Sequence, residues 1–99
     1  MGAVSVPFNA TSSTVAVKVR GDSEYPLLED GALVFYSKHL PVSKMLGKRC
    51  IVHLVNGSVY VKTPQKSEIE GLFDLVSVNA PTMKAQNIDR CSPIEWIKP

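Results

Sequence analysis

Short apolar runs separated by turn residues are the feature that most constrains how this chain can fold. No segment of a dozen residues carries a 3.6-residue apolar period, so no long amphipathic helix is predicted. Runs rich in β-branched and aromatic residues between Gly, Pro, Asn and Asp are typical of strands. We therefore predict an all-β fold, a single compact domain of about six mostly antiparallel strands. The expected strands cover residues 14–19, 32–36, 49–55, 58–62, 72–78 and 94–97.

The connections between these runs predict a hairpin and two longer loops. Asn56-Gly57 is the strongest short hairpin dipeptide and joins the third run to the fourth. Thr63-Pro64 is expected to end the fourth strand, because proline cannot donate to a ladder. Loops are expected at 39–48, with room for one helical turn, and at 82–89. A chain of 99 residues makes one domain; we expect residues 1–13 to be a linker or tail and residues 14–99 to form the domain.

Charge and cysteine content exclude several function classes. The formal net charge is only +2, and Lys48-Arg49 is the only adjacent basic pair, so this domain itself is not expected to bind nucleic acid. No apolar stretch approaches the roughly 20 residues that span a bilayer, and no signal pattern opens the chain. Cys50 and Cys91 lack a CxxC spacing, which favours a reducing compartment. We expect a cytoplasmic protein without a membrane anchor, in which Cys50 behaves as a small buried apolar residue.

Metal and cofactor motifs are missing from the sequence. His39 and His53 have no partner at ligand spacing, and the carboxylates follow no metal-loop pattern. No strand–GxGxxG–helix unit exists. We therefore predict no metal and no cofactor, and we expect His53 to be a hydrogen-bonded core or edge residue. Trp96 is interpreted as a core residue or an anchor in a dimer interface.

A serine on a turn and a lysine on a strand form the candidate site. Ser23 follows Gly21-Asp22 directly after an apolar strand, and Lys62 ends the second arm of the hairpin. A serine hydroxyl needs a base, and a lysine is one only when neutral. The ammonium group has an ordinary pKa of ~10.4, which burial lowers by up to ~3–5 units. Lys62 is expected to point inward with Tyr60. A serine and a lysine also occur together by chance in many chains. In that case Lys62 would lie on an edge strand with its amine in solvent, and Ser23 would only form the turn.

The surrounding residues resemble a known family. Gly21-Asp22-Ser23-x-x-Pro26-x-x-x-Asp30-Gly31, followed by an apolar strand, resembles the nucleophile segment of LexA-like autopeptidases, which include LexA repressors, phage CI-type repressors and UmuD-like proteins. The hairpin ending in Val-x-Val-Lys62 is similar to the lysine strand of that family. Leu75-x-Ser77-x-Asn79 and Ile94-x-Trp96-Ile97 look like its last two strands. The resemblance covers residue 14 to the C-terminus.

This resemblance implies a LexA C-terminal-domain-like fold and specific roles. Ser23 would be the nucleophile, Lys62 the general base, and the backbone N–H groups of Ser23 and Asp22 the oxyanion hole. Family members cut a bond in their own upstream linker and so release an N-terminal helix-turn-helix domain. The expected partners are a second copy of this domain, that linker as substrate, DNA only through the N-terminal domain, and a RecA filament as trigger in SOS-responsive members.

Two departures from the family leave alternatives open. Glu24 stands where the family usually has methionine, and a carboxylate near Lys62 would favour its charged form and oppose catalysis. No Ala-Gly or Cys-Gly pair, the usual cleavage bonds, precedes Ser23, so we expect the cut bond to lie outside this chain. One alternative is a non-catalytic dimerisation module of a transcriptional regulator with a vestigial dyad. Another is a membrane-bound signal peptidase, which the lack of an anchor opposes.

Overall fold

Strands dominate the computed structural model, which describes residues 13–99. The strands are β1 (Val15–Lys18), β2 (Leu33–Tyr36), β3 (Cys50–Leu54), β4 (Val59–Lys66), β5 (Phe73–Val76), β6 (Met83–Gln86), β7 (Ile88–Ser92) and β8 (Trp96–Lys98), with a short 3₁₀ helix η1 (Val42–Lys44) between β2 and β3. The all-β prediction is confirmed, as is the single helical turn. No helix within residues 13–99 is long and apolar enough to cross a membrane. The expected tail falls almost wholly outside these residues.

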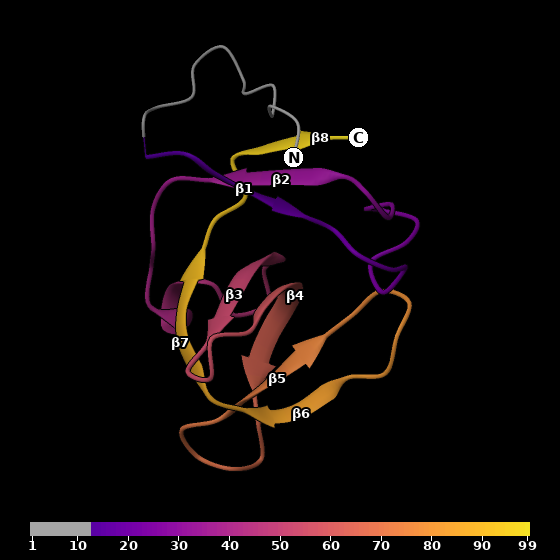
Figure 1. Ribbon diagram of the computed structural model, residues 1–99. Helices are drawn as coiled ribbons and strands as arrows, with labels where there is room; N and C mark the ends of the chain where they lie inside the picture. Colours follow the sequence, from indigo (N-terminus) through magenta and orange to yellow (C-terminus); the bar gives the residue numbers. More distant parts are fainter. Residues whose placement is uncertain (1–12) are drawn as a thin grey trace.

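The strands form two antiparallel sheets (Figure 1). The smaller sheet has the order β1-β2-β8, and the larger has the order β6-β5-β4-β3-β7. The chain builds two strands of the small sheet, crosses to complete the large one, and returns so that β8 pairs with β2. As a result, β1 and β8 are the two edge strands of the small sheet.

Strand β3 is buried along its whole length because both of its faces are covered. Cys50, Val52 and Leu54 lie in one apolar cluster with Leu75. Ile51 lies in a second cluster, whose other buried members are Val19, Leu28, Ala32 and Val34. A strand with two buried faces carries a near-continuous apolar run, and β3 is apolar except for His53. Cys50 is fully buried, as expected.

The predicted hairpin joins β3 to β4 and determines where Lys62 lies. Gly57 adopts a φ of +92°, a conformation that side chains disfavour, and its N–H donates to the Leu54 carbonyl over 3.0 Å. The Asn56 side chain accepts a bond from the Ser58 N–H at 2.9 Å. The resulting register sets Lys62 opposite Cys50, the first residue of β3.

Pro64 does not end β4, and that expectation was wrong. The strand pairs with β3 up to Lys62 and with β5 from Thr63 onward. The N–H and C=O of one residue in an antiparallel strand point to the same side. Pro64 directs its carbonyl to the Gly47 N–H, 2.8 Å away, on the side where pairing with β3 has ceased. The missing N–H therefore removes no ladder bond.

The expected loop at residues 82–89 was also wrong, because it contains β6 and the start of β7. The described chain therefore has eight strands rather than about six. Both additional strands lie at the edges of the large sheet, where polar residues are tolerated and apolar alternation is weak. Ala85 within β6 has a positive φ of 55°, and the pairing with β5 shifts register. Because of these irregularities, the sequence of β6 does not show the alternating apolar pattern of a regular strand.

Candidate active site

Ser23 is held in a closed loop between β1 and β2. The Gly31 N–H donates to the Val19 carbonyl over 2.8 Å and closes the base of the loop. The Gly21 N–H donates to Asp30 Oδ1 over 2.8 Å and ties its two ends together. Gly21 has a φ of +79° and Gly31 a φ of +90°, which explains why these positions carry glycine. The glycines and the aspartate in the sequence pattern around Ser23 are therefore explained by the two hydrogen bonds that close this loop.

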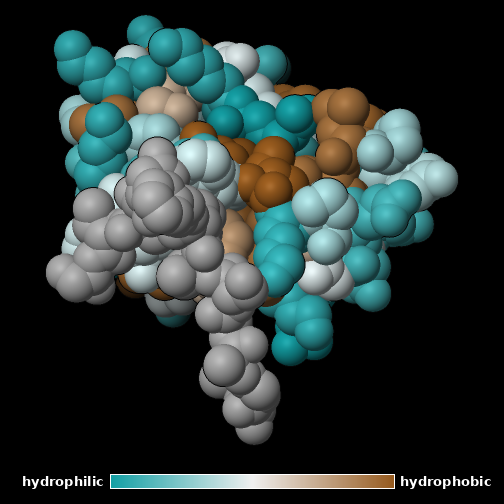
Figure 2. Space-filling view, turned by 90° about the horizontal axis from the view of Figure 1, so that it is seen from above, coloured by the Kyte–Doolittle hydropathy of each residue, from teal (hydrophilic) through white to brown (hydrophobic). Residues whose placement is uncertain are grey.

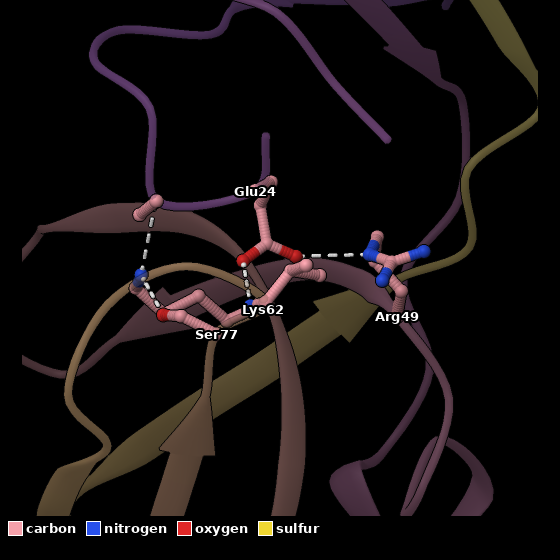
Figure 3. A network of polar contacts seen from close by, with 6 residues as sticks. Glu24, Arg49, Lys62 and Ser77 are labelled. Atoms are coloured by element: carbon pink, nitrogen blue, oxygen red, sulfur yellow. Dashed lines mark hydrogen bonds and ion pairs between the residues drawn. The ribbon is translucent and has the colours of Figure 1, made fainter. Parts of the chain in front are cut away.

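Lys62 lies on β4, and its side chain extends toward Ser77 beneath that loop (Figure 3). Its side chain is buried, with 6% of the residue exposed. Lys62 Nζ lies 3.3 Å from Ser23 Oγ and 5.8 Å from the centre of the Tyr60 ring. The contact that the sequence predicted is therefore present, and Lys62 is buried as expected. The distance suits proton transfer, since catalytic hydrogen bonds in free enzymes often exceed the usual 2.6–3.2 Å.

Ser77 is a second neighbour of Lys62 that sequence reasoning missed. It follows β5, and its Oγ lies only 2.5 Å from Lys62 Nζ. Its stretch, Leu75-x-Ser77-x-Asn79, was matched to the family as a strand, with no role for the hydroxyl. A signal was present, because polar residues two apart at the end of an apolar strand project to one side.

The segment that carries Ser77 is bonded directly to the nucleophile loop. The Asn79 N–H donates to the Ser23 carbonyl over 2.7 Å. The Asn79 side-chain amide donates to the Asp22 carbonyl over 3.1 Å. Two hydrogen bonds thus fix the segment after β5 against the residues that carry the nucleophile. Asn79, like Ser77, had no role assigned from sequence.

Glu24 is buried beside the site, but its carboxylate is directed to Arg49. Only 2% of Glu24 is exposed. Arg49 Nε donates to Oε1 over 2.9 Å, and the Val78 N–H donates to Oε2 over 3.1 Å. Among residues 13–99 no ion pair joins Glu24 to Lys62. The anticipated carboxylate–lysine pairing is therefore absent, because an arginine and a backbone amide satisfy this buried charge instead.

An open groove of about 330 Å³ contains the pair. One wall is β1 with the residues that follow it, 17–20, and the other is residues 59–62 of β4. Ser23 and Glu24 complete the lining. Alternating valines give both walls apolar side chains, and Lys18 and Arg20 add positive charge. Ser23 is half-buried at this groove, so it can contact an external segment.

The remaining candidate groups have structural explanations. His39 Nδ1 and His53 Nε2 both contact Ser92 Oγ, at 2.8 and 3.0 Å. His53 is buried and hydrogen-bonded, as expected. Contact with Cys91 and burial raise the pKa of the Cys50 thiol, so it is protonated at neutral pH. Within residues 13–99, no three His, Cys, Asp or Glu side chains are grouped to hold a metal.

Fold and groove together define a class: a small all-β domain with a serine hydroxyl against a buried lysine amine, the arrangement of a candidate serine–lysine peptidase. The model of the family described as Peptidase S24-like matches residues 3–98. The chain belongs to this family, that of the LexA C-terminal and phage CI-type autopeptidases. Comparison with curated proteins and comparison with solved structures each gave no match.

Proposed function

We propose that this chain is the self-cleaving peptidase and dimerisation domain of a LexA-like or phage-type repressor. The observation that carries the proposal is the 3.3 Å contact between Lys62 Nζ and Ser23 Oγ inside an open groove. Membership of the S24-like family supports the same chemistry. Ser23 is the nucleophile, and Lys62 is the general base.

The reaction runs in two acyl-transfer steps. Ser23 Oγ attacks the carbonyl carbon of the scissile bond as neutral Lys62 Nζ takes the hydroxyl proton. The tetrahedral intermediate collapses, the C–N bond breaks, and Lys62 returns the proton to the leaving nitrogen. An ester on Ser23 remains. Water then attacks this ester, giving one proton to Lys62, and Ser23 leaves and takes that proton back. Because Lys62 must be neutral at the outset, the rate rises with pH.

The backbone N–H groups of Asp22 and Ser23 are the proposed oxyanion donors. In the part of the chain that the structure describes, neither group has a hydrogen-bond acceptor, whereas the carbonyls of both residues accept bonds from Asn79. The loop is thus held by its carbonyls while its N–H groups remain available. Each oxyanion donor of this kind is typically worth about 3 kcal/mol of transition-state stabilisation.

The proposed substrate is an extended segment, the linker upstream of this domain in its own chain. Strand β1 is an edge strand, and residues 59–62 of β4 pair only with β3 among the described strands. Both walls of the groove therefore have a backbone edge that an added strand can pair with. The valine side chains on both walls favour small apolar side chains next to the scissile bond.

The proposed partner is a second copy of this domain, in the cytoplasm. Figure 2 shows apolar side chains open to solvent on the face above the small sheet. Leu27 and Ile97 are more than half exposed, and both line a hollow of about 260 Å³ beside β8. Dimerisation would set two helix-turn-helix heads on two half-sites of DNA. A RecA filament is the proposed trigger, by resemblance to SOS-responsive relatives.

The test is self-cleavage of the parent chain, extended upstream through its linker. Intact mass is followed from neutral to strongly alkaline pH, with Ser23→Ala and Lys62→Met as controls. We expect a cut that accelerates with pH and is lost in both variants. A folded parent that stays whole at every pH, with and without a RecA filament, would instead favour a non-catalytic dimerisation module.

A further inference from the structure

Glu24 places a buried carboxylate in the loop that carries the nucleophile. Taking such a group out of water is unfavourable, so it persists only where its hydrogen bonds and ion pairs compensate. Here Arg49 Nε donates to one oxygen over 2.9 Å, and the Val78 N–H donates to the other over 3.1 Å (Figure 3). Both oxygens are thus engaged by parts of the chain distant in sequence from Glu24.

Those two partners are the chain neighbours of residues that pair with or contact Lys62. Arg49 directly precedes Cys50, which pairs with Lys62 in the β3–β4 register. Val78 directly follows Ser77, whose hydroxyl lies 2.5 Å from Lys62 Nζ. Glu24 itself directly follows Ser23. One carboxylate therefore joins the nucleophile loop to both sides of the lysine environment.

We propose that Glu24, through its ion pair with Arg49, is a positioning residue that holds Ser23 within reach of Lys62. The carboxylate touches neither reacting atom. Without the ion pair the loop keeps its closing bonds but loses its link to β3, and the Ser23–Lys62 contact lengthens. A displacement of about 1 Å in a reacting group can cost about 100-fold in rate. This inference rests on the proposed function, and it gives the carboxylate a role where LexA-like proteins usually carry methionine.

The test measures the reactivity of Ser23 itself, with a fluorophosphonate probe on the full chain. Ser23 Oγ attacks phosphorus, the P–F bond breaks, fluoride leaves with the bonding electrons, and the hydroxyl proton passes to Lys62. The variants are Glu24→Met, Glu24→Gln, Arg49→Met and the double variant Glu24→Met/Arg49→Met. Each is labelled well below its melting temperature, and intact mass gives the rate. Glu24→Gln keeps the shape of the side chain, and it replaces Glu24→Met in the labelling test if Glu24→Met does not fold.

A matched control separates positioning from stability. Asp74 also accepts one ion-pair bond, from Lys84 at 3.3 Å, and one backbone bond, from the Ala85 N–H at 3.0 Å, outside the groove lining. We expect Asp74→Asn to lower the melting temperature without changing the labelling rate. The Glu24 variants are expected to label roughly tenfold to a hundredfold more slowly.

The double variant distinguishes a positioning role of Glu24 from a purely stabilising one. It leaves no unpaired buried charge, so its melting temperature should recover relative to Arg49→Met, while its labelling rate stays low. A labelling rate that recovers with stability would overturn the positioning role, as would folded Glu24 variants that label like the wild type. If the wild type itself is not labelled at Ser23, the proposed function fails as well, so the two failures are distinguishable.

Discussion

Lys62 has two hydroxyl neighbours, and the nearer one is Ser77 rather than Ser23, the proposed nucleophile. Ser77 Oγ lies 2.5 Å from its Nζ, against 3.3 Å for Ser23 Oγ. A neutral amine has one lone pair and two N–H donors. If an N–H is donated to Ser77, the lone pair is left free to face Ser23. In the proposed reaction Ser77 would thus orient Lys62 without taking part in proton transfer.

We expect Ser77→Ala to slow cleavage by roughly tenfold to a hundredfold, since the base loses its orienting acceptor while the amine remains. Ser77→Thr, which keeps the hydroxyl, should retain most of the rate. First-order rates of self-cleavage provide the measurement, and Ser67→Ala, a serine change outside the groove lining, is the control. An unchanged rate in Ser77→Ala would show that Ser23 alone orients the lysine.

The candidate site was predictable where its signals were local. Ser23 lies within a turn pattern and Lys62 at the end of a hairpin, and both patterns are read from neighbouring residues. Ser77 had only the weak signal of polar residues at the end of an apolar strand, and Arg49 had none, because their contacts cross 15 and 25 residues of chain. Only the assembled sheets bring these groups to Lys62 and Glu24.

At the level of elements, Ser92 on β7 connects β3 to the segment after β2. His39 and His53 both contact its hydroxyl, with their ring centres 5.1 Å apart. A serine has one proton to donate, so one imidazole must donate to it instead. Burial, Arg90 and His39 lower the pKa of His53, outweighing Asp89. The fold therefore favours neutral His53.

A lowered His53 pKa makes stability depend on pH in a definite direction. Above about pH 6.5 the imidazole is neutral in both folded and unfolded chains, and its contribution is complete. As the pH falls below that value, the unfolded chain binds the proton before the folded chain does. The free energy of unfolding therefore decreases until the pH reaches the folded-state pKa of His53, by at most about 1.4 kcal/mol per pH unit. Urea unfolding between pH 7.5 and 5 should show this loss, and His53→Gln should flatten it. An equally steep curve in the variant would assign the loss to other groups.

Elements were predictable where both strands and turns had strong signals. The buried runs of β2 and β3 and the Asn56-Gly57 turn were found because burial requires apolar residues and the turn requires a positive φ. Edge strands β6 and β7 were missed, because an edge tolerates polar residues and bulges. Pro64 was wrongly expected to end β4, because its missing N–H lies on the side where β4 no longer pairs with β3.

At the scale of the whole molecule, β8 is the last strand on one side of the small sheet among the described residues 13–99. Trp96 is 37% exposed and Ile97 52%, so neither is a core residue here. Two copies can pair β8 edges about a two-fold axis, an isologous contact that buries the same residues on both sides. The domain would then carry its groove and its dimer contact on separate elements.

We expect a homodimer well above micromolar concentration, and Ile97→Asp should shift it to monomer by placing a charge in the paired edge. Val55→Asp is the control, since Val55 is 61% exposed on the hairpin. Sedimentation equilibrium measures both. A monomeric wild type, or equal dissociation in both variants, would contradict a contact through β8.

The central claim is that Lys62 activates Ser23, and the most direct measurement is the pH dependence of Ser23 labelling by the fluorophosphonate probe. The account predicts label on Ser23, a rate that rises with pH, and a fall of roughly 100-fold or more in Lys62→Met, with no label in Ser23→Ala. Label elsewhere on the chain, or a Lys62→Met rate equal to that of the wild type across the pH range, would contradict it.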